Sequence, residues 1–595
     1  MVVNDPKVPE AHLTDLVSAV QYGYYDRVVE LIEPAPQLAS TPVNGNITLL
    51  HWAAINNRIE IAKYLINKRA DVNALGGELN STPLHWATRD GKLEMVIFLL
   101  SQQADASLFD GEGFSSLHLA SMFGHTAIVA YLIAKGQEID LPDKHGMTSL
   151  MHAVSRTRSR DPTQLLVRLG SQINYQNLTN GFTALHYAII AANRDVIQML
   201  LTAGASTDIR NSHNETPYDL ATRASESRYL IHLLSQNQLL NPRLPKSLQF
   251  HKSTRRIGTK LSPYFGLFFV ACLFQWNISL IYKGVLLFVL FIVSKGYIMI
   301  FYDNDVDRNL PISIAQASIF WLYICYFYYI VPNIPVTLWL MILIVICTYL
   351  SWSNYYLAEK RDPGFITGNR EQLYRIIIQL VEQNSFDDTN FCSACLIQRP
   401  IRSKHCKECR RCVAKFDHHC PWIDNCVGEK NLRYFVGFLF FTPLCLALYL
   451  YGAYLYYRYH CHLFASETIL QGLTTAFTCK PAVLLFTGLA FLHITWISGL
   501  CLTILFQIAN GYTTNEKMNY WRYQYLRSNL RSPFSFGYVQ NLVDLINRSI
   551  CGYSPIILDW SRIYSLDDFH ENIPIRIRQK MNLSSVKSST DFSNV

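Results

Sequence analysis

Residues 392–426 read CSACLIQRPIRSKHCKECRRCVAKFDHHCPWIDNC, and this stretch decides how the middle of the chain folds. Seven of the fifteen cysteines lie within it, together with three histidines. The N-terminus lacks the apolar core of a signal peptide, so we expect a reducing compartment, where crowded cysteines bind metal or catalyse. Zinc sites need four soft or borderline ligands, and each C-x-x-C step supplies two thiolates. The stretch therefore predicts a zinc-binding module.

The stretch holds enough ligands for two zinc sites and leaves two residues over. The eight candidate ligands are Cys392, Cys395, His405, Cys406, Cys409, Cys412, His419 and Cys426. Spacing alone does not decide which of them share a metal. A closed zinc site is structural, so reactivity should lie in the unused residues His418 and Cys420. Asp417 precedes this pair, and a thiol beside a base has the makings of an activated nucleophile.

Long apolar runs flank the cysteine-rich stretch on both sides. Each is long enough to cross a bilayer of ~30 Å as a helix, and they cover residues 264–282, 284–302, 312–331, 335–356, 434–457 and 482–509. The only charged residue within them, Lys295, is long enough to snorkel to the interface. Lys and Arg gather in 357–433 and 510–580. The positive-inside pattern therefore predicts six spans, with the cysteine-rich stretch and both termini in the cytosol.

A repeat of 33 or 34 residues fills the N-terminal part of the chain. Related strings recur as TLLHWAA, TPLHWAT, SSLHLAS, TSLMHAV and TALHYAI, with histidines at 51, 85, 118, 152 and 186. They resemble the ankyrin T-P-L-H-x-A motif, in which Thr caps the first helix and the apolar positions bury against the next repeat. We expect an α-solenoid over residues 14–235. We interpret the histidines as hydrogen-bonding groups within the repeats rather than metal ligands.

Three other functions are compatible with parts of this pattern. An ankyrin arm before six spans also describes a cation channel, but residues 458–481 contain no filter-like ring of carbonyl or acidic groups. Zinc knots are more often structural than catalytic, so an inactive scaffold stays open as an alternative, opposed by the unused residues Asp417, His418 and Cys420. A nucleic-acid-binding finger conflicts with spans on both sides. The net charge of +8 is modest, and basic stretches beside the spans explain it.

The cysteine-rich stretch resembles the DHHC domain of protein S-acyltransferases at every motif position, including Asp-His-His-Cys at 417–420 and Asn431. Residues 362–364 after the fourth span resemble the family's Asp-Pro-Gly element, and residues 513–516 after the sixth resemble its Thr-Thr-x-Glu element. With the repeats, the chain is most similar to the ankyrin-repeat subgroup, the huntingtin-interacting palmitoyltransferases. The resemblance covers nearly the whole chain.

The resemblance implies a mechanism. His418 would take the thiol proton of Cys420, and Asp417 would orient the imidazole. Cys420 would accept a long acyl chain, such as palmitate, from acyl-CoA and pass it to cysteines of partner proteins in a ping-pong sequence. Thr514, Asn431 and Trp422 would support these steps. One structural Zn²⁺ would be bound by Cys392, Cys395, His405 and Cys412, and the other by Cys406, Cys409, His419 and Cys426.

Two further groups of residues have less specific signals. Arg399, Arg402 and Lys404 are suited to pair with CoA phosphates, and a solvated basic loop near anionic lipid explains them equally well. The resemblance implies that Asn56 and Trp86 line a groove on the arm for an extended, proline-containing peptide of a substrate protein. Packing between repeats is the ordinary role of such an aromatic. The resemblance favours the Golgi and its vesicles.

Together these features predict an all-α chain with an ankyrin solenoid, a six-helix membrane bundle and a small two-zinc module. The expected parts are the ankyrin domain 14–235, a basic juxtamembrane linker 236–262, spans one to four in 263–356, the zinc domain 357–433, spans five and six in 434–509, and a cytosolic tail 510–595. Whether Cys461 and Cys479 form a disulfide stays open.

Overall fold

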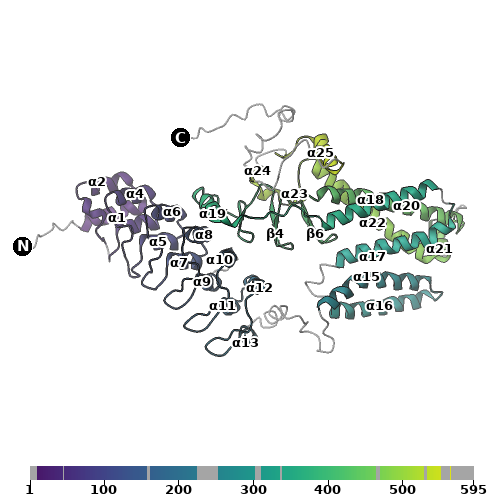
Figure 1. Cartoon of the computed structure of the whole chain (residues 1–595), viewed down its shortest axis with the longest axis horizontal. Coiled ribbons are helices and arrows are strands. Elements are labelled where there is room, and N and C mark those ends of the chain that lie inside the picture. Colours follow the sequence, from purple (N-terminus) through teal and green to yellow (C-terminus); the bar gives the residue numbers. More distant parts are fainter. Residues whose placement is uncertain are drawn as a thin grey trace, which may run out of the picture. The chain divides into compact units, whose positions relative to one another are not determined.

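The computed structural model describes residues 10–43, 46–156, 161–223, 252–301, 310–335, 338–463, 469–527, 532–550 and 563. The chain forms two compact units (Figure 1). One contains Met1–Gln238 with Thr367–Gln398, and the other contains Leu239–Ile366 with Arg399–Val595. The first unit therefore includes a segment that follows the first four apolar runs in the sequence.

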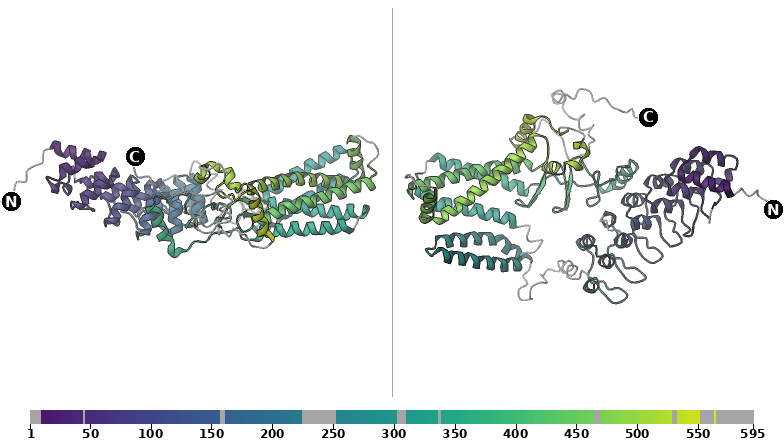
Figure 2. Two further views of the ribbon diagram at one scale, coloured as in Figure 1. Left: turned by 90° about the horizontal axis from the view of Figure 1, so that it is seen from above. Right: turned by 180° about the vertical axis from the view of Figure 1, so that it is seen from behind.

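The first unit is built from a stack of helix pairs, as the repeats predict (Figure 2). The helices are α1 (Glu10–Tyr22), α2 (Tyr25–Ile32), η1 (Pro36–Ala39), α3 (Leu49–Ile55), α4 (Ile59–Asn67), α5 (Pro83–Arg89), α6 (Leu93–Ser101), α7 (Ser116–Phe123), α8 (Thr126–Ala134), α9 (Ser149–Arg156), α10 (Asp161–Leu169), α11 (Ala184–Ile190), α12 (Arg194–Thr202) and α13 (Pro217–Arg223). A continuous core of Leu, Ile, Val and Ala side chains runs along the stack. Each repeat thus buries its apolar face against its neighbours.

The repeat histidines are buried hydrogen-bonding groups. In the first clear repeat, the Thr48 amide donates to His51 Nδ1 at 3.2 Å, and His51 Nε2 donates to the Ser81 carbonyl of the next repeat at 2.8 Å. Four of the five histidines, His51, His85, His118 and His186, cap their own helix in this way and also join two repeats, whereas His152 bonds Asp143 in the turn before its own helix. Burial lowers the pKa of His51, and it lowers the pKa of His118 to about 4. The interpretation of the histidines as structural groups is confirmed. The structure adds that a repeat histidine such as His51 also bonds a carbonyl of the next repeat.

The first unit also contains the start of the cysteine-rich region. A short turn, η6 (Arg370–Gln372), leads into the amphipathic helix α19 (Leu373–Glu382), and the strands β1 (Phe391–Cys392) and β2 (Ile397–Gln398) follow. The apolar side of α19 belongs to the same core as the ankyrin helices. No sequence motif assigned this helix to the arm.

The second unit contains the apolar helices. They are α15 (Lys252–Gln275), α16 (Leu280–Phe301), α17 (Leu310–Cys325) continued by η4 (Tyr326–Ile330) and η5 (Val331–Asn333), α18 (Leu338–Lys360), α20 (Leu432–Tyr459), the short α21 (Ile469–Cys479) and α22 (Pro481–Ala509). Among the described residues, five helices are long and apolar enough to cross a membrane. The expected second span forms α16, whose side chains are described only in part, and it is not among the five.

Two element boundaries differ from the expected ones. α15 begins at Lys252, so the last part of the expected linker 236–262 is helical and continuous with the first apolar run. Lysine and arginine are good helix formers, which explains why the helix extends into this basic segment. α18 continues to Lys360, four residues past the end of the expected fourth span. The α15 extension is basic, whereas the α18 extension contains one acidic and one basic residue, Glu359 and Lys360, which pair with each other.

The cysteine-rich region forms three short hairpins. β1 pairs with β2, β3 (Lys404–Cys406) pairs with β4 (Arg411–Val413), and β5 (His418–Cys420) pairs with β6 (Asn425–Val427). The residues Leu396, Arg410 and Asp424 have positive φ angles of 54°, 55° and 46°. These tight turns let the ends of each hairpin approach one another. The C-terminal part adds α23 (Thr514–Met518), η7 (Tyr520–Arg522), α24 (Gln524–Arg527) and α25 (Tyr538–Ile550).

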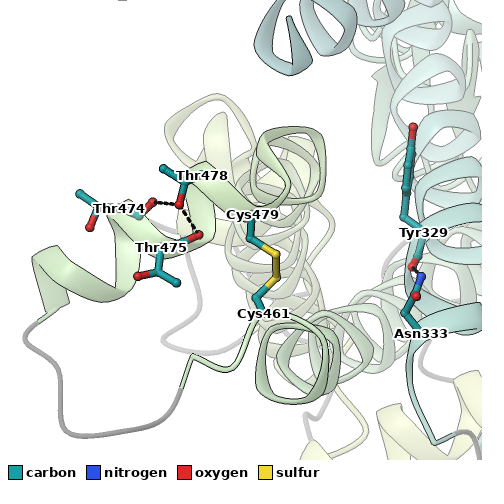
Figure 3. The surroundings of a disulfide bond; sticks show 7 residues. All are labelled: Tyr329, Asn333, Cys461, Thr474, Thr475, Thr478 and Cys479. Carbon is teal, nitrogen blue, oxygen red and sulfur yellow. Dashed lines mark hydrogen bonds between the residues drawn. A yellow bond between two sulfur atoms is a disulfide. The ribbon is translucent and has the colours of Figure 1, made fainter. Parts of the chain in front are cut away.

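A disulfide closes the segment between α20 and α22. Cys461, just after α20, is bonded to Cys479 at the end of α21 (Figure 3). The bond fixes the end of α21 beside the end of α20. The structure thereby answers the question that the sequence left open.

Candidate active site

The eight expected metal ligands form two clusters of four. Within each cluster the candidate ligand atoms all lie within 4.8 Å of one another, and the clusters are Cys392, Cys395, His405 and Cys412, and Cys406, Cys409, His419 and Cys426. This grouping is the one that the family resemblance implies. Both clusters combine three thiols with one imidazole, a set typical of structural zinc sites.

Distances inside the clusters suit shared zinc ions. Cys409 Sγ lies 3.3 Å from Cys426 Sγ and 3.5 Å from His419 Nδ1. Cys412 Sγ lies 3.9 Å from His405 Nδ1. Sulfur and nitrogen ligands of one tetrahedral zinc are separated by about 3.5–3.8 Å, given bond lengths of ~2.3 and ~2.0 Å. The residues present therefore fit two four-coordinate ions with no open position.

Strand β5 separates a metal-facing histidine from the residues that the metal does not use. Because successive side chains of a strand point to opposite sides, His418 and Cys420 share one side and His419 faces the other. His419 contacts the sulfurs of Cys409 and Cys426. His418 hydrogen-bonds with the Cys420 side chain. The strand thus brings the Cys–His pair together.

Asp417 completes this arrangement. Its Oδ2 lies 2.7 Å from His418 Nδ1, and its carboxylate is buried. The backbone amide of Thr514 donates to Asp417 Oδ1 at 2.8 Å. Thr514, which the family resemblance implies as a supporting residue, thus contacts Asp417 through its main chain, and its hydroxyl donates to Gln507 at 2.8 Å. Gln507 lies inside an apolar run, and no motif singled it out.

The electrostatics of the pair favour a charged imidazole beside a carboxylate. Burial disfavours a charge on His418, but hydrogen bonds with Asp417 and Cys420 outweigh it and raise the pKa of His418 to about 9. Burial also opposes ionisation of Asp417, yet the hydrogen bond with His418 and the Thr514 amide keep the pKa of that carboxyl below its usual value. An imidazolium formed by accepting a thiol proton is therefore stabilised where it arises.

Cys420 lies at the edge of an apolar region between the long helices. Its side chain is buried in the same cluster as Tyr355 and Ile423. The Tyr355 hydroxyl donates to the Trp422 carbonyl at 3.3 Å, and the Trp422 ring packs against Trp496. Trp422 is thus packed against the bundle beside the nucleophile. Tyr355, within an apolar run, carried no sequence signal.

A pocket lies among α17, α18 and α20. Its lining is mostly apolar and aromatic, with Tyr355 among the lining residues together with Leu322, Ile344, Phe438 and Leu446. Because Tyr355 also contacts the loop that follows Cys420, the cavity reaches the neighbourhood of the thiol.

Asn431 links the hairpin of β5 and β6 to helix α18. Its Nδ2 donates to the Ala358 and Cys426 carbonyls at 3.1 and 2.8 Å, and its Oδ1 accepts from the Gly428 amide at 2.9 Å. The residue is fully buried. All three bonds are internal, so Asn431 fixes the position of β6 relative to α18 and touches no open space.

The three basic residues of the central loop have different environments. Arg402 is buried and makes two bonds of 2.7 and 2.6 Å with the carboxylate of Glu516, with its guanidinium over the Phe534 ring. The expectation that Arg402 faces CoA phosphates is therefore not met, because its charge is already paired. Lys404 is half-buried and donates to Asn515 at 2.6 Å. Burial, then the charges of Arg522 and Arg399, lower the pKa of Lys404.

The arm residues singled out from the sequence lie close together. The Trp86 ring packs edge-on against Trp52, with centroids 5.6 Å apart, and against His51 at 5.2 Å. The Asn56 side chain donates to the Trp52 carbonyl at 2.9 Å. Trp86 and Asn56 are both half-buried. Packing between repeats therefore accounts for one side of Trp86, and the rest of the ring stays accessible.

Comparisons with known proteins agree with this arrangement. The DHHC palmitoyltransferase family matches residues 385–521, and ankyrin-repeat families match residues 16–110, 104–177 and 166–221. Palmitoyltransferase ZDHHC17 of Danio rerio is 42% identical over 564 residues, which cover 93% of this chain and 90% of that protein. The chain belongs to the DHHC palmitoyltransferase family.

Other members of the family are similar over the same length. Palmitoyltransferase ZDHHC17 of Homo sapiens is 41% identical over 568 residues, covering 93% of this chain and 89% of that protein. Palmitoyltransferase Hip14 of Drosophila melanogaster is 38% identical over 575 residues, covering 94% and 90%. This palmitoyltransferase therefore combines the ankyrin arm, the apolar helices and the cysteine-rich module in one chain, as the huntingtin-interacting subgroup does. Its activity is protein S-palmitoyl transfer.

Proposed function

We propose that Cys420 is the nucleophile of this palmitoyltransferase and that His418 and Asp417 activate it. His418 takes the thiol proton, and the Cys420 thiolate attacks the thioester carbonyl of acyl-CoA. The bond between the acyl carbon and the CoA sulfur breaks, and CoA leaves with the proton from His418. A substrate thiol then gives its proton to His418 and attacks the Cys420 thioester; the bond between the acyl carbon and Cys420 breaks, and His418 returns the proton to the Cys420 sulfur. The Asp417–His418 contact of 2.7 Å, beside the one thiol of the module outside both metal clusters, carries this proposal.

The acyl chain occupies the cavity among α17, α18 and α20 while the CoA group stays in the aqueous phase. The lining is apolar, and a long acyl chain gains from burial there at about 0.8 kcal/mol per methylene. Arg399 and Lys404 pair with the CoA phosphates. Besides burial, the positive charges of Arg522 and Arg399 lower the pKa of Lys404, so these three residues form a basic patch that can bind an anionic group. Arg402 has a different role, because it holds Glu516.

Two Zn²⁺ ions hold the hairpins in place when they are bound. Each ion has four protein ligands and no open position, so the metals serve structure rather than chemistry. The second ion's ligands include His419 and Cys426, on the strands that also carry Cys420. Metal binding thereby sets the position of the nucleophile.

The chain spans a membrane six times with both termini in the cytosol. The second span is α16, which we add to the five helices that are long and apolar enough to cross a membrane. The disulfide Cys461–Cys479 supports the topology, because disulfides persist in oxidising compartments. Residues 460–480 then face the lumen and the cysteine-rich module faces the cytosol. The family resemblance favours the Golgi and its vesicles as the compartment.

The ankyrin arm recruits substrate proteins. A solenoid presents an extended surface, and no cysteine lies in residues 14–235, so the arm has no nucleophile of its own. Trp86 offers an indole face and Asn56 an amide for the backbone of an extended, proline-containing peptide. The arm and the acyl-transfer site therefore perform separate tasks within one chain.

Incubation of the purified protein with labelled palmitoyl-CoA tests the nucleophile. The wild-type chain should become labelled, and hydroxylamine should release the label, because it cleaves thioesters. Cys420→Ser should abolish self-acylation and transfer while retaining zinc, and Cys272→Ser in α15 is a matched control outside both metal clusters and away from the cavity. A hydroxylamine-labile label at wild-type level on Cys420→Ser would assign the chemistry to another cysteine. An unlabelled wild-type chain would favour the inactive scaffold.

A further inference from the structure

Helix α19 packs on the ankyrin stack, although it follows the fourth apolar helix in the sequence. It lies beside α8 (Figure 1). Leu373, Ile377, Leu380 and Val381 are buried, and they belong to the ankyrin core. The i, i+4, i+7 and i+8 spacing places these four side chains on one face of the helix. That face is covered by the arm, whereas Tyr374 on the same helix is 46% exposed.

The arm carries a matching surface. The second helices of the earlier repeats, α4 and α6, bury three residues each, as expected for helices with a solvent face. α8 buries six consecutive residues, Ile128–Ile133. A helix that is apolar all round is normally covered on all sides. α8 is thus covered on a side that α4 and α6 leave partly exposed, and α19 is the helix that covers it.

Polar contacts fix the end of α19 on the same repeat. The Tyr131 hydroxyl of α8 donates to Glu382 Oε1 at 3.1 Å. Lys135 approaches the same carboxylate at 3.6 Å, and its ammonium lies over the Tyr131 ring. Tyr131 is 1% exposed, so its hydroxyl depends on this bond for satisfaction. The contact between α19 and α8 therefore combines buried apolar side chains with specific polar bonds that fix where α19 lies on α8.

We propose that α19 is an intramolecular docking helix that tethers the recruiting arm to the acyl-transfer module, so that a protein held on the arm meets Cys420 at high effective concentration. The first candidate zinc ligand, Cys392, follows Glu382 by about ten residues, which span at most roughly 35 Å. Without docking, the arm would be joined to the acyl-transfer unit through residues 224–251, which lead to α15 and contain about three times as many residues as the segment from Glu382 to Cys392. Effective concentration falls with about the −3/2 power of tether length, hence about fivefold.

The proposal rests on the recruiting role of the arm, and its test does not need the recruiting groove. A short cysteine-containing reporter peptide is fused to the N-terminus of the full chain through a Gly-Ser linker, and its acylation is compared with that of the free peptide. The first-order rate constant for the fused peptide divided by the second-order rate constant for the free peptide is the effective concentration of the arm at Cys420. Ile377→Glu places a charge on the docked face, and Tyr374→Glu places the same charge on the exposed face.

Ile377→Glu should lower the effective concentration about fivefold and increase hydrogen exchange of the α19 amides, without changing zinc content or acylation of the free peptide. Tyr374→Glu should match the wild type. A second variant, a Gly-Ser insertion between Asp388 and Thr389, lengthens the tether without touching the docked face and should lower the ratio in the same way. Unchanged ratios in both altered chains, protection of α19 in Ile377→Glu, or no advantage of the fused reporter in the wild type would overturn the proposal. The fused reporter does not use the groove at Trp86, so a failure of the recruiting role would leave every ratio unchanged. Failure of the recruiting role and failure of the docking proposal would therefore give different results.

Discussion

The buried ion pair between Arg402 and Glu516 should be a main determinant of stability in the acyl-transfer unit. The two side chains are 3% and 1% exposed, and two bonds of 2.7 and 2.6 Å join them. Glu516→Gln keeps the shape but leaves the Arg402 charge without a counter-charge. Breaking one side of such a pair costs about 3–5 kcal/mol, whereas replacing both partners with apolar residues is often neutral. The double variant Arg402→Met/Glu516→Leu should therefore be more stable than Glu516→Gln.

Guanidinium unfolding of the purified protein in detergent, followed by tryptophan fluorescence, gives the three free energies, with the exposed Glu371→Gln as the matched control. Glu516→Gln should also slow acylation of Cys420. Glu516 Oε2 accepts from the Thr513 amide at 2.8 Å and so holds the start of α23, whose next amide supports Asp417. A Glu516→Gln chain within about 1 kcal/mol of the wild type, or a double variant less stable than the single one, would refute this account of the pair.

Three further outcomes are expected. His418→Ala should slow acyl-enzyme formation by about two orders of magnitude or more and keep both zinc ions, whereas His419→Ala should lose zinc. Metal analysis of both variants beside the labelling assay tests this. Equal zinc loss from both variants would contradict the ligand assignment. Trp86→Ala should leave labelling of Cys420 unchanged but weaken partner capture at least tenfold, and undiminished capture by a folded variant would remove Trp86 from the groove. Burial lowers the pKa of His118 to about 4, so the folded arm binds the His118 proton more weakly than the unfolded chain does. This difference should contribute about 3 kcal/mol to the stability of the arm above pH 6.5, and the contribution should be lost as the pH falls toward 4. In circular dichroism melts, His118→Asn should reduce this loss of stability in acid.

The parts of the fold that repeat or that bind metal were predictable from the sequence. Each ankyrin repeat carries its own cap and core residues, so local pattern suffices to place it. The ligands of the two clusters follow from the identities of cysteine and histidine, and only their grouping needed the family resemblance. Asp417, His418 and Cys420 stood out because they were the reactive residues that the metal clusters did not use.

Other features depend on contacts between distant segments, and no local pattern contains them. Arg402 and Lys404 carry the same charge two residues apart, yet Arg402 meets Glu516, which lies more than one hundred residues later, and Lys404 stays half-buried. α19 is an amphipathic decamer within an otherwise polar segment, and its partner α8 lies about 240 residues earlier. The excess of apolar residues in α8 was the one available signal for a missing neighbour.

The alternation of side chains along β5 makes the active site sensitive to register. Adjacent residues with the same side chain, His418 and His419, serve a proton and a metal only because the strand turns them to opposite sides. A slip of one residue against β6 would exchange the two imidazoles and carry the Cys420 sulfur away from its base. Insertion or deletion of a single residue in this hairpin should therefore be more damaging than most substitutions there, since it would misplace the metal ligand and the base together.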